Sequence, residues 1–269
     1  MDIVSLQFAF FTVVSVIIFY LLPNRYRNGY LTLISCAFIA GFDYWLLVYL
    51  IAYSVVNYFI GIKLPGSKKQ TALFRTGIIL NLTQLILLKY ASFAIDPLFR
   101  IFDIDLFVSK ISEIIIPIGV SYFTLQGIGY LINVKMGWEK PESKFSDLLL
   151  YLAFFPKFLS GPIERSNHFL PQIKKKVSLN ESQVVTGLRI ALIGFFKKVA
   201  IANQLAPFVS ITFSNLNAAD GFAPLLLLLL LPTYLYFDFS RYTDIAIGIA
   251  KMFGIDLLPN FNRPFFSQN

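Results

Sequence analysis

The stretch that decides the fold is YFDFSRYTDIAIGIAKMFGIDLLPNFNRPFFSQN, residues 236–269, which follows seven consecutive leucines at 225–231. Such a leucine run lies in lipid or in a wholly apolar core. Asp238, Arg241 and Asp244 then follow at three-residue spacing, which places neighbours on one face of a helix. Because charge at membrane depth is costly unless it is paired or lines a watery cavity, this segment is the first candidate for a functional site.

A structural interpretation of the same segment stays open beside the functional one. Two carboxylates that flank one guanidinium would also hold two helices in register without any chemistry. Behind the charges, Ala246, Ala250 and Gly254 repeat every four residues. Small residues at this spacing allow another helix to approach closely, so this stripe predicts packing only.

Composition indicates an α-helical integral membrane protein. The chain of 269 residues is 57% hydrophobic and 14% charged, against about 25% charged residues in soluble domains. The apolar runs are long and unbroken, whereas a β-barrel would alternate over segments of about ten residues. The net charge of +8 lies mainly in short loops, which is the positive-inside pattern and needs no nucleic-acid partner. The single cysteine, Cys36, lies in an apolar run and is expected to be a buried thiol.

The first apolar run predicts a retained membrane helix and an orientation. Ile3 to Leu22 has about the 20 residues that a span requires. Arg25 and Arg27 follow this run, and its other end carries only Asp2. The positive-inside rule then places the N-terminus outside the cytoplasm and residues 24–28 inside it.

The next apolar runs predict a broken helix pair and two further crossings. Residues 30–62 are interrupted at Gly41-Phe42-Asp43, and two full crossings would need about 40 residues. This region is therefore expected to be either a short, tilted pair or a re-entrant hairpin. Residues 76–95 and 114–134 are expected to cross, with an outer interfacial helix over 96–112.

Shorter elements follow in the second half of the chain. Leu148 to Leu159 is too short to span and runs into Ser160-Gly161-Pro162, which indicates a re-entrant element. Ser178 is predicted to cap the next helix, with Glu181 completing a capping box. The fold expected for residues 1–269 is a single membrane-embedded domain: an all-α polytopic, multi-helix bundle with short and re-entrant helices.

Three basic residues are further candidates. Lys197 and Lys198 interrupt an apolar run, where they either snorkel to the cytoplasmic face or line an aqueous entry where an anionic donor could dock. The only histidine is His168, so no histidine-based metal site and no metal ion are expected. A lone loop histidine is more often a surface residue, but His168 is retained as a candidate general base.

Motifs in order along nearly the whole chain resemble the membrane-bound O-acyltransferase family. The similarity is to its bacterial branch, which contains alginate O-acetyltransferases and the D-alanyl transfer protein of teichoic-acid synthesis. Arg241 stands where the family usually has glycine. The motifs are PNRYRNGYL at 23–31 with FDYWLLVYLIAYSVVNYFIGIKL at 42–64, PIGVSYFTLQGIGYLINVKMG at 117–137, FPKFLSGPIER at 155–165, GFFKKVAIAN at 194–203, and YFDFSRYTDIAIGIAKMFGIDLLPNFNRPF at 236–265.

The resemblance implies a multi-pass enzyme of the bacterial inner, cytoplasmic membrane. Its donor, acetyl-CoA or an acyl carrier thioester, would approach from the cytoplasm as a substrate, and no bound cofactor is expected. The acyl group, expected to be acetyl, would reach hydroxyls of an extracytoplasmic polysaccharide, directly or through a second acetyltransferase. The other expected partners are membrane lipid and the donor's carrier protein.

The resemblance also implies a catalytic histidine in a W-x-x-W-H-type motif soon after N-F-x-x-P-[YF], which falls past Asn269. The chain is therefore expected to be the N-terminal portion of a longer enzyme, and His168 does not match that position. Attack of a hydroxyl on a thioester needs a base, which is the role of this histidine. The residues expected to line the tunnel or support the active site are Tyr122, Gln126, Glu164, Arg165, Asp238, Ser240, Tyr242, Asp244 and Asn262, with Lys197 and Lys198 on the donor side.

Three alternatives to a working acyltransferase stay open at this point: a non-catalytic membrane scaffold, a small-solute transporter, and an inactive truncated acyltransferase. A transporter would show weak inverted repeats together with discontinuous helices. The chain has broken segments at 41–43 and 160–162, but it contains no recognisable repeat.

Overall fold

The computed structural model describes residues 5–101, 119–159, 161–215 and 222–260. Within these ranges the secondary structure is helical and contains no strand, which confirms the all-α prediction. The expected outer helix lies mostly outside the described residues. The helices are α1 (Leu6–Leu21), α2 (Asn24–Ala40), α3 (Tyr44–Lys63), α4 (Gln70–Ile101), α6 (Val120–Lys135), α7 (Phe145–Ala153), α8 (Phe155–Phe158), α9 (Ser166–Ile173), α10 (Glu181–Phe196), the π-helix η1 (Lys197–Ala202), α11 (Asn203–Ser214) and α12 (Phe222–Met252).

Three of the described helices are long and apolar enough to cross a membrane. They are α3, the segment Gln70–Lys89 of α4, and α12. The helix α1 is also apolar, but it has only 16 residues. Length and composition therefore agree with a polytopic membrane protein, as the apolar runs of the sequence predict.

The predicted interruptions of the apolar runs are confirmed. The helix α2 ends at Ala40, and α3 begins at Tyr44. Asp43 caps α3, because its Oδ1 accepts a hydrogen bond from the Trp45 amide at 2.8 Å. Such a cap satisfies an amide that has no partner within its own helix. In the second half, α8 ends at Phe158 and the described residues 161–165 are not helical.

The predicted start of α10 is wrong by two residues. Asn180, and not Ser178, is the N-cap, and its Oδ1 accepts from the Gln183 amide at 3.2 Å. Asparagine and serine are about equally good N-cap residues, so the sequence pattern alone does not distinguish Asn180 from Ser178. Glu181 is the first helical residue and is therefore not the third residue of a capping box.

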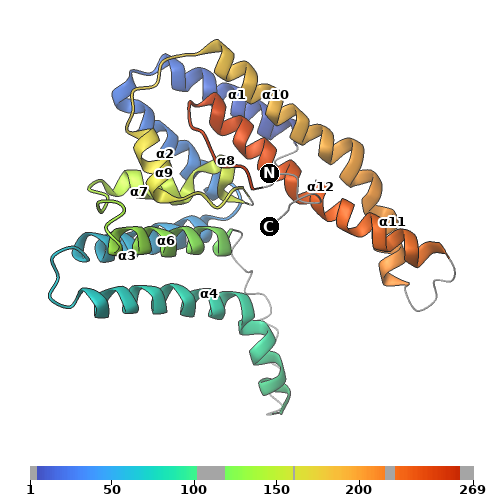
Figure 1. The fold of residues 1–269 in the computed structure, drawn as a ribbon, viewed down its shortest axis with the longest axis horizontal. Coiled ribbons are helices and arrows are strands. Elements are labelled where there is room, and N and C mark those ends of the chain that lie inside the picture. The colour runs from blue at the N-terminus through green and yellow to red at the C-terminus, as the bar shows by residue number, and fades with distance from the viewer. Residues whose placement is uncertain (1–4, 102–118, 160, 216–221, 261–269) are drawn as a thin grey trace. The chain divides into compact units, whose positions relative to one another are not determined.

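The chain divides into two compact units. Figure 1 labels the helices that belong to each and colours the chain by residue number. The first unit contains residues 1–30, 160–164 and 172–269, and therefore holds α1, α10, η1, α11 and α12. The second unit contains residues 31–159 and 165–171, and holds α3, α4, α6, α7 and α8.

In the first unit, α10 and α12 pack closely where two glycines meet. A Cβ atom on Gly248 would lie 2.5 Å from the carbonyl oxygen of Gly187, so only glycine fits there. Ala246 and Ala250 of the predicted stripe are fully buried. The third member, Gly254, lies beyond the end of α12 with a φ of 80°. It closes the helix, because the Ile255 amide donates to the Ala250 carbonyl at 3.0 Å, the pattern of a glycine cap.

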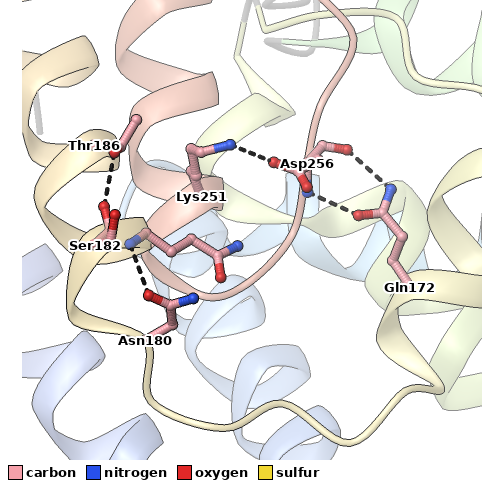
Figure 2. Close-up of polar contacts among 7 residues, drawn as sticks. Gln172, Asn180, Ser182, Thr186, Lys251 and Asp256 are labelled. Carbon is pink, nitrogen blue, oxygen red and sulfur yellow. Dashed lines mark hydrogen bonds and ion pairs between the residues drawn. The ribbon is translucent and has the colours of Figure 1, made fainter.

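Hydrogen bonds and an ion pair hold the segment after α12 in place within the first unit (Figure 2). The Gln172 side chain makes two hydrogen bonds to the backbone of Asp256, at 2.9 and 2.8 Å. The Asp256 carboxylate also pairs with Lys251 at 2.8 Å. These contacts hold the chain beyond α12 against the segment that precedes α10.

Candidate functional site

A charged cluster joins η1 to α12 in the first unit. We define it as Lys197 and Lys198 from η1, together with Asp238, Arg241 and Asp244 from α12. The π-helix lies between α10 and α11. Such segments insert one extra residue into a turn and occur frequently at functional sites. Both lysines of the cluster lie in the first turn of this π-helix.

Lys197 is bound to two residues of α12. Its Nζ lies 2.5 Å from Oδ2 of Asp244 and 2.6 Å from Oγ of Ser240. Ser240 is itself buried. Because an ammonium group only donates hydrogen bonds, the serine oxygen and the carboxylate both accept from it. Lys197 therefore orients Ser240 and Asp244 together.

Asp238 receives two other cations on one oxygen atom. Nε and Nη2 of Arg241 each lie 2.9 Å from its Oδ1. Nζ of Lys198 lies 3.6 Å from the same Oδ1. The sequence interpretation placed Arg241 between both carboxylates, whereas the structure pairs Asp244 with Lys197. The reason is that η1 brings a cation from another helix to that position.

The cluster is partly buried and carries an excess of positive charge. Its side chains are between 12% and 31% exposed. Three cations face two carboxylates in it, so one positive charge is uncompensated within the cluster. Lys198 makes the longest of these ion pairs, and it is therefore the cation most readily drawn to an incoming anion.

The structure adds a residue that the sequence interpretation missed. Lys157 of α8 is fully buried in the second unit. Its Nζ donates to Oε1 of Gln126 at 2.9 Å. It also lies 4.3 Å from the ring centre of Tyr151 and 4.8 Å from that of Phe169. Aromatic faces stabilise such a cation when water is excluded. The sequence did contain a signal for this residue, because Lys157 is the one charged residue in the apolar run 148–159.

Lys157 determines how the predicted site residue Gln126 is oriented. Because the ammonium can only donate, it requires the amide oxygen of Gln126 to face it. Gln126 is buried on α6, and its backbone carbonyl accepts a weaker hydrogen bond from the Tyr151 hydroxyl at 3.4 Å. The lysine therefore joins α6, α7, α8 and α9 around one buried charge.

The remaining predicted residues lie in varied surroundings. Glu164 is buried in the first unit, where its Oε2 accepts from the Leu258 amide at 2.9 Å. Tyr242 lies next to the charged cluster, with the Arg241 guanidinium 5.5 Å from its ring centre. Asn262 lies outside the described residues. In the second unit, Tyr122 and His168 are half-buried, and Arg165 is exposed.

The structure therefore brings together six of the predicted residues: Lys197, Lys198, Asp238, Ser240, Tyr242 and Asp244. In the described part of the chain, no three histidine, cysteine, aspartate or glutamate side chains gather as they would around a metal ion. What this arrangement offers chemically is a set of oriented carboxylates beside cations, suited to holding a polar group and an anion.

Comparison with known proteins points to one family. Residues 143–268 match the sequence model of MBOAT, the membrane-bound O-acyltransferase family. The matched range includes the whole charged cluster and Lys157.

Individual relatives are similar over most of the chain. It is 34% identical to a probable alginate O-acetylase, AlgI, of Azotobacter vinelandii, over 94% of this chain and 51% of that protein. It is 32% identical to a peptidoglycan O-acetyltransferase of Helicobacter pylori, over 89% and 50%. A teichoic acid D-alanyltransferase of Bacillus subtilis is 30% identical over 56% of this chain and 39% of its own length. The chain thus spans about half the length of the O-acetylating relatives it matches.

Proposed function

This chain belongs to the membrane-bound O-acyltransferase family, and from that premise we propose that the full-length protein transfers an acyl group to hydroxyls of a polysaccharide outside the cytoplasm. We further propose acetyl as the acyl group, carried on a cytoplasmic thioester. The choice of acetyl rests on coverage: similarity to O-acetylating relatives extends over 94% and 89% of the chain, against 56% for the D-alanyl relative.

The observation that carries the proposal is the charged cluster inside the matched range. Partly buried charges in an apolar helical hairpin are costly, and they are retained chiefly where they hold helices in register or act on a substrate. The family match favours the second role. The family match also gives the excess positive charge of the cluster an expected binding partner, because both expected donors, acetyl-CoA and a carrier thioester, are anionic.

The chemistry assigns a role to each part of the cluster. In the transfer, the acceptor hydroxyl oxygen forms a bond to the acyl carbon and a base takes the hydroxyl proton. The carbon–sulfur bond breaks, and the sulfur leaves with its electron pair as a thiolate, which is then protonated to the free thiol. Asp238 and Asp244 would orient either that base or the acceptor hydroxyl, as hydrogen-bond acceptors held in place by cations. Lys198 would face the anionic portion of the donor.

An assay of the full-length protein in proteoliposomes tests the proposal. Labelled acetyl thioester is supplied on the side that carries residues 24–28, and label on the polysaccharide is measured. We expect Asp238→Asn to reduce transfer at least tenfold with unchanged membrane insertion. The matched control is Asp256→Asn, because Asp256 is 60% exposed and lies in an ion pair outside the cluster. Full activity of Asp238→Asn would remove the assignment of this site.

The donor role of Lys198 has its own kinetic signature. We expect Lys198→Gln to raise KM for the thioester several-fold and to leave kcat nearly unchanged, because it alters binding of the donor alone. The same proteoliposomes also test the other functions. Solute uptake without acyl transfer would favour a transporter, and the absence of both activities in the full-length protein would favour a scaffold.

A further inference from the structure

A cleft between two membrane-spanning helices of the second unit has no role in acyl transfer as described above. It has a volume of about 300 Å³ and lies between α3 and the first half of α4. That volume is at the lower end of ligand-binding pockets, which range over roughly 300–1,000 Å³. It is lined by Tyr49, Ala52, Tyr53, Val56, Asn57, Leu80, Asn81 and Gln84.

Hydrogen bonds connect the polar residues of the cleft to one another and to α6. Tyr53 donates through its hydroxyl to Oδ1 of Asn81, and Nδ2 of Asn81 donates to Oδ1 of Asn57 at 3.0 Å. Nε2 of Gln84 donates to Oγ1 of Thr124 on α6 at 2.6 Å. Interhelical hydrogen bonds of this kind hold membrane helices together. These bonds connect α3, α4 and α6, which lie along one another in Figure 1.

The mouth of the cleft is apolar and exposed within the described residues. Both helices that form it are long and apolar enough to span. Val56 and Leu80 at the cleft are 45% and 49% exposed, and their neighbours Phe59 and Ile79 are 54% and 61% exposed. None of the lining residues is charged. Because both helices have the length and composition of membrane spans, we infer that lipid acyl chains reach this cleft, and an uncharged lining disfavours a charged occupant.

One polar group of the cleft wall lacks a partner. The Tyr49 hydroxyl is buried, and no hydrogen-bond partner lies within reach of it in the described structure. A buried hydroxyl without a hydrogen-bond partner destabilises the folded protein, because it has given up its bonds to water. An occupant that brings an acceptor oxygen would remove that cost after a small shift of the half-buried tyrosine ring.

We propose that this cleft binds one acyl chain of a bilayer glycerolipid, with the chain against Ala52, Val56 and Leu80 and the ester carbonyl accepting a hydrogen bond from Tyr49. The apolar lining suits the chain, and the absence of charge among the lining residues suits an ester. The site would serve as a lipid anchor that fills the gap between α3 and α4. It is independent of acyl transfer, because none of its residues belongs to the charged cluster.

Photo-crosslinking tests the site in the full-length protein reconstituted in nanodiscs. The probe is phosphatidylethanolamine with a diazirine in one acyl chain, and labelled peptides are mapped by mass spectrometry. We expect labelling of α3 and α4 to fall at least threefold in Ala52→Phe, which fills the cleft from an exposed position. Tyr49→Phe, which removes only the hydroxyl, should give a smaller but measurable fall.

The control is Val48→Phe, which adds a ring at a 41% exposed position of α3 that does not line the cleft. Its labelling should equal that of the native protein. Native labelling in Ala52→Phe, or an equal fall in Val48→Phe, would overturn the proposal. Unchanged labelling in Tyr49→Phe would overturn the hydrogen bond to the ester. None of these readouts depends on acyl-transfer activity.

Discussion

At the scale of the residue, two buried or partly buried lysines show how one charge orients neutral groups. Lys197 holds Ser240 and Asp244 of α12, and Lys157 holds the amide of Gln126. In both places the ammonium group offers only donors, so the orientation of each acceptor follows from it. Each of these lysines therefore fixes the position of the oxygens that accept from it.

Replacing Lys157 tests this role in the second unit. Lys157→Met keeps most of the side-chain volume but leaves the buried Gln126 oxygen without its donor, which costs about 1–3 kcal/mol. We expect a lower Tm for the purified full-length protein in detergent. Adding Gln126→Leu should recover part of the loss, since a pair replaced entirely by apolar groups leaves nothing unsatisfied. Lys140→Met, at an exposed loop position, is the control, and an equal Tm for all variants would refute the role.

At the scale of the element, helix ends and helix contacts depend on single small residues. Asn180 is the N-cap of α10, and Gly254 forms the glycine cap that follows α12. Gly187 and Gly248 let these two helices approach closely. This contact is what brings η1 alongside the charged part of α12.

The start of α10 is tested by two alanine substitutions. Asn180→Ala removes the cap of the Gln183 amide and should cost about 1 kcal/mol. Ser178→Ala removes the residue that sequence pattern favoured, and it should stay within about 0.5 kcal/mol of the native protein. Hydrogen exchange at the first turn of α10 reads out the difference directly. Faster exchange in Ser178→Ala than in Asn180→Ala would reverse the assignment of the cap.

The glycine contact is tested by adding one methyl group. Gly248→Ala places a Cβ atom 2.5 Å from backbone atoms of α10, and such overpacking costs about 1–3 kcal/mol. We expect a lower Tm together with reduced acyl transfer, because separating the helices also separates Lys197 from Asp244. Gly29→Ala meets no atom within 4 Å and should be neutral or slightly stabilising. Neutral behaviour of Gly248→Ala would mean that the helices lie further apart.

At the scale of the whole molecule, the lengths of the spans bear on topology. The helix α3 has 20 residues, which at 1.5 Å per residue extend over about 30 Å, the thickness of a hydrocarbon core. This length favours a full crossing for α3 over a re-entrant turn. The positive-inside pattern then predicts that the break at 41–43 lies on the outer side and that the basic loop near Lys68 and Lys69 lies in the cytoplasm.

Cysteine labelling tests that topology in the full-length protein after all native cysteines, Cys36 among them, are replaced by alanine. A membrane-impermeant maleimide added outside intact spheroplasts should label Tyr44→Cys, at a position that is 64% exposed, and should leave Ser67→Cys unlabelled. Inverted vesicles should give the opposite result. If neither position is labelled from outside while Ser67→Cys is labelled in inverted vesicles, the pair is re-entrant.

Sequence by itself determined the class of the protein, the interruptions of its apolar runs and the residue types of its charged cluster. These follow from local patterns: apolar length, helix-breaking residues and three-residue spacing all act within one segment. The family was likewise evident from motifs in order along the chain, such as FPKFLSGPIER at 155–165.

Only the tertiary structure decided which charges meet. Asp244 pairs with Lys197, 47 residues earlier, because the glycine contact holds α10 against α12 and the π-helix that follows α10 also packs on α12. The burial of Lys157 and the cleft beside Tyr49 likewise arise where several helices converge. Pairing and burial depend on the packing of segments distant in sequence, and no periodicity within one segment carries that information.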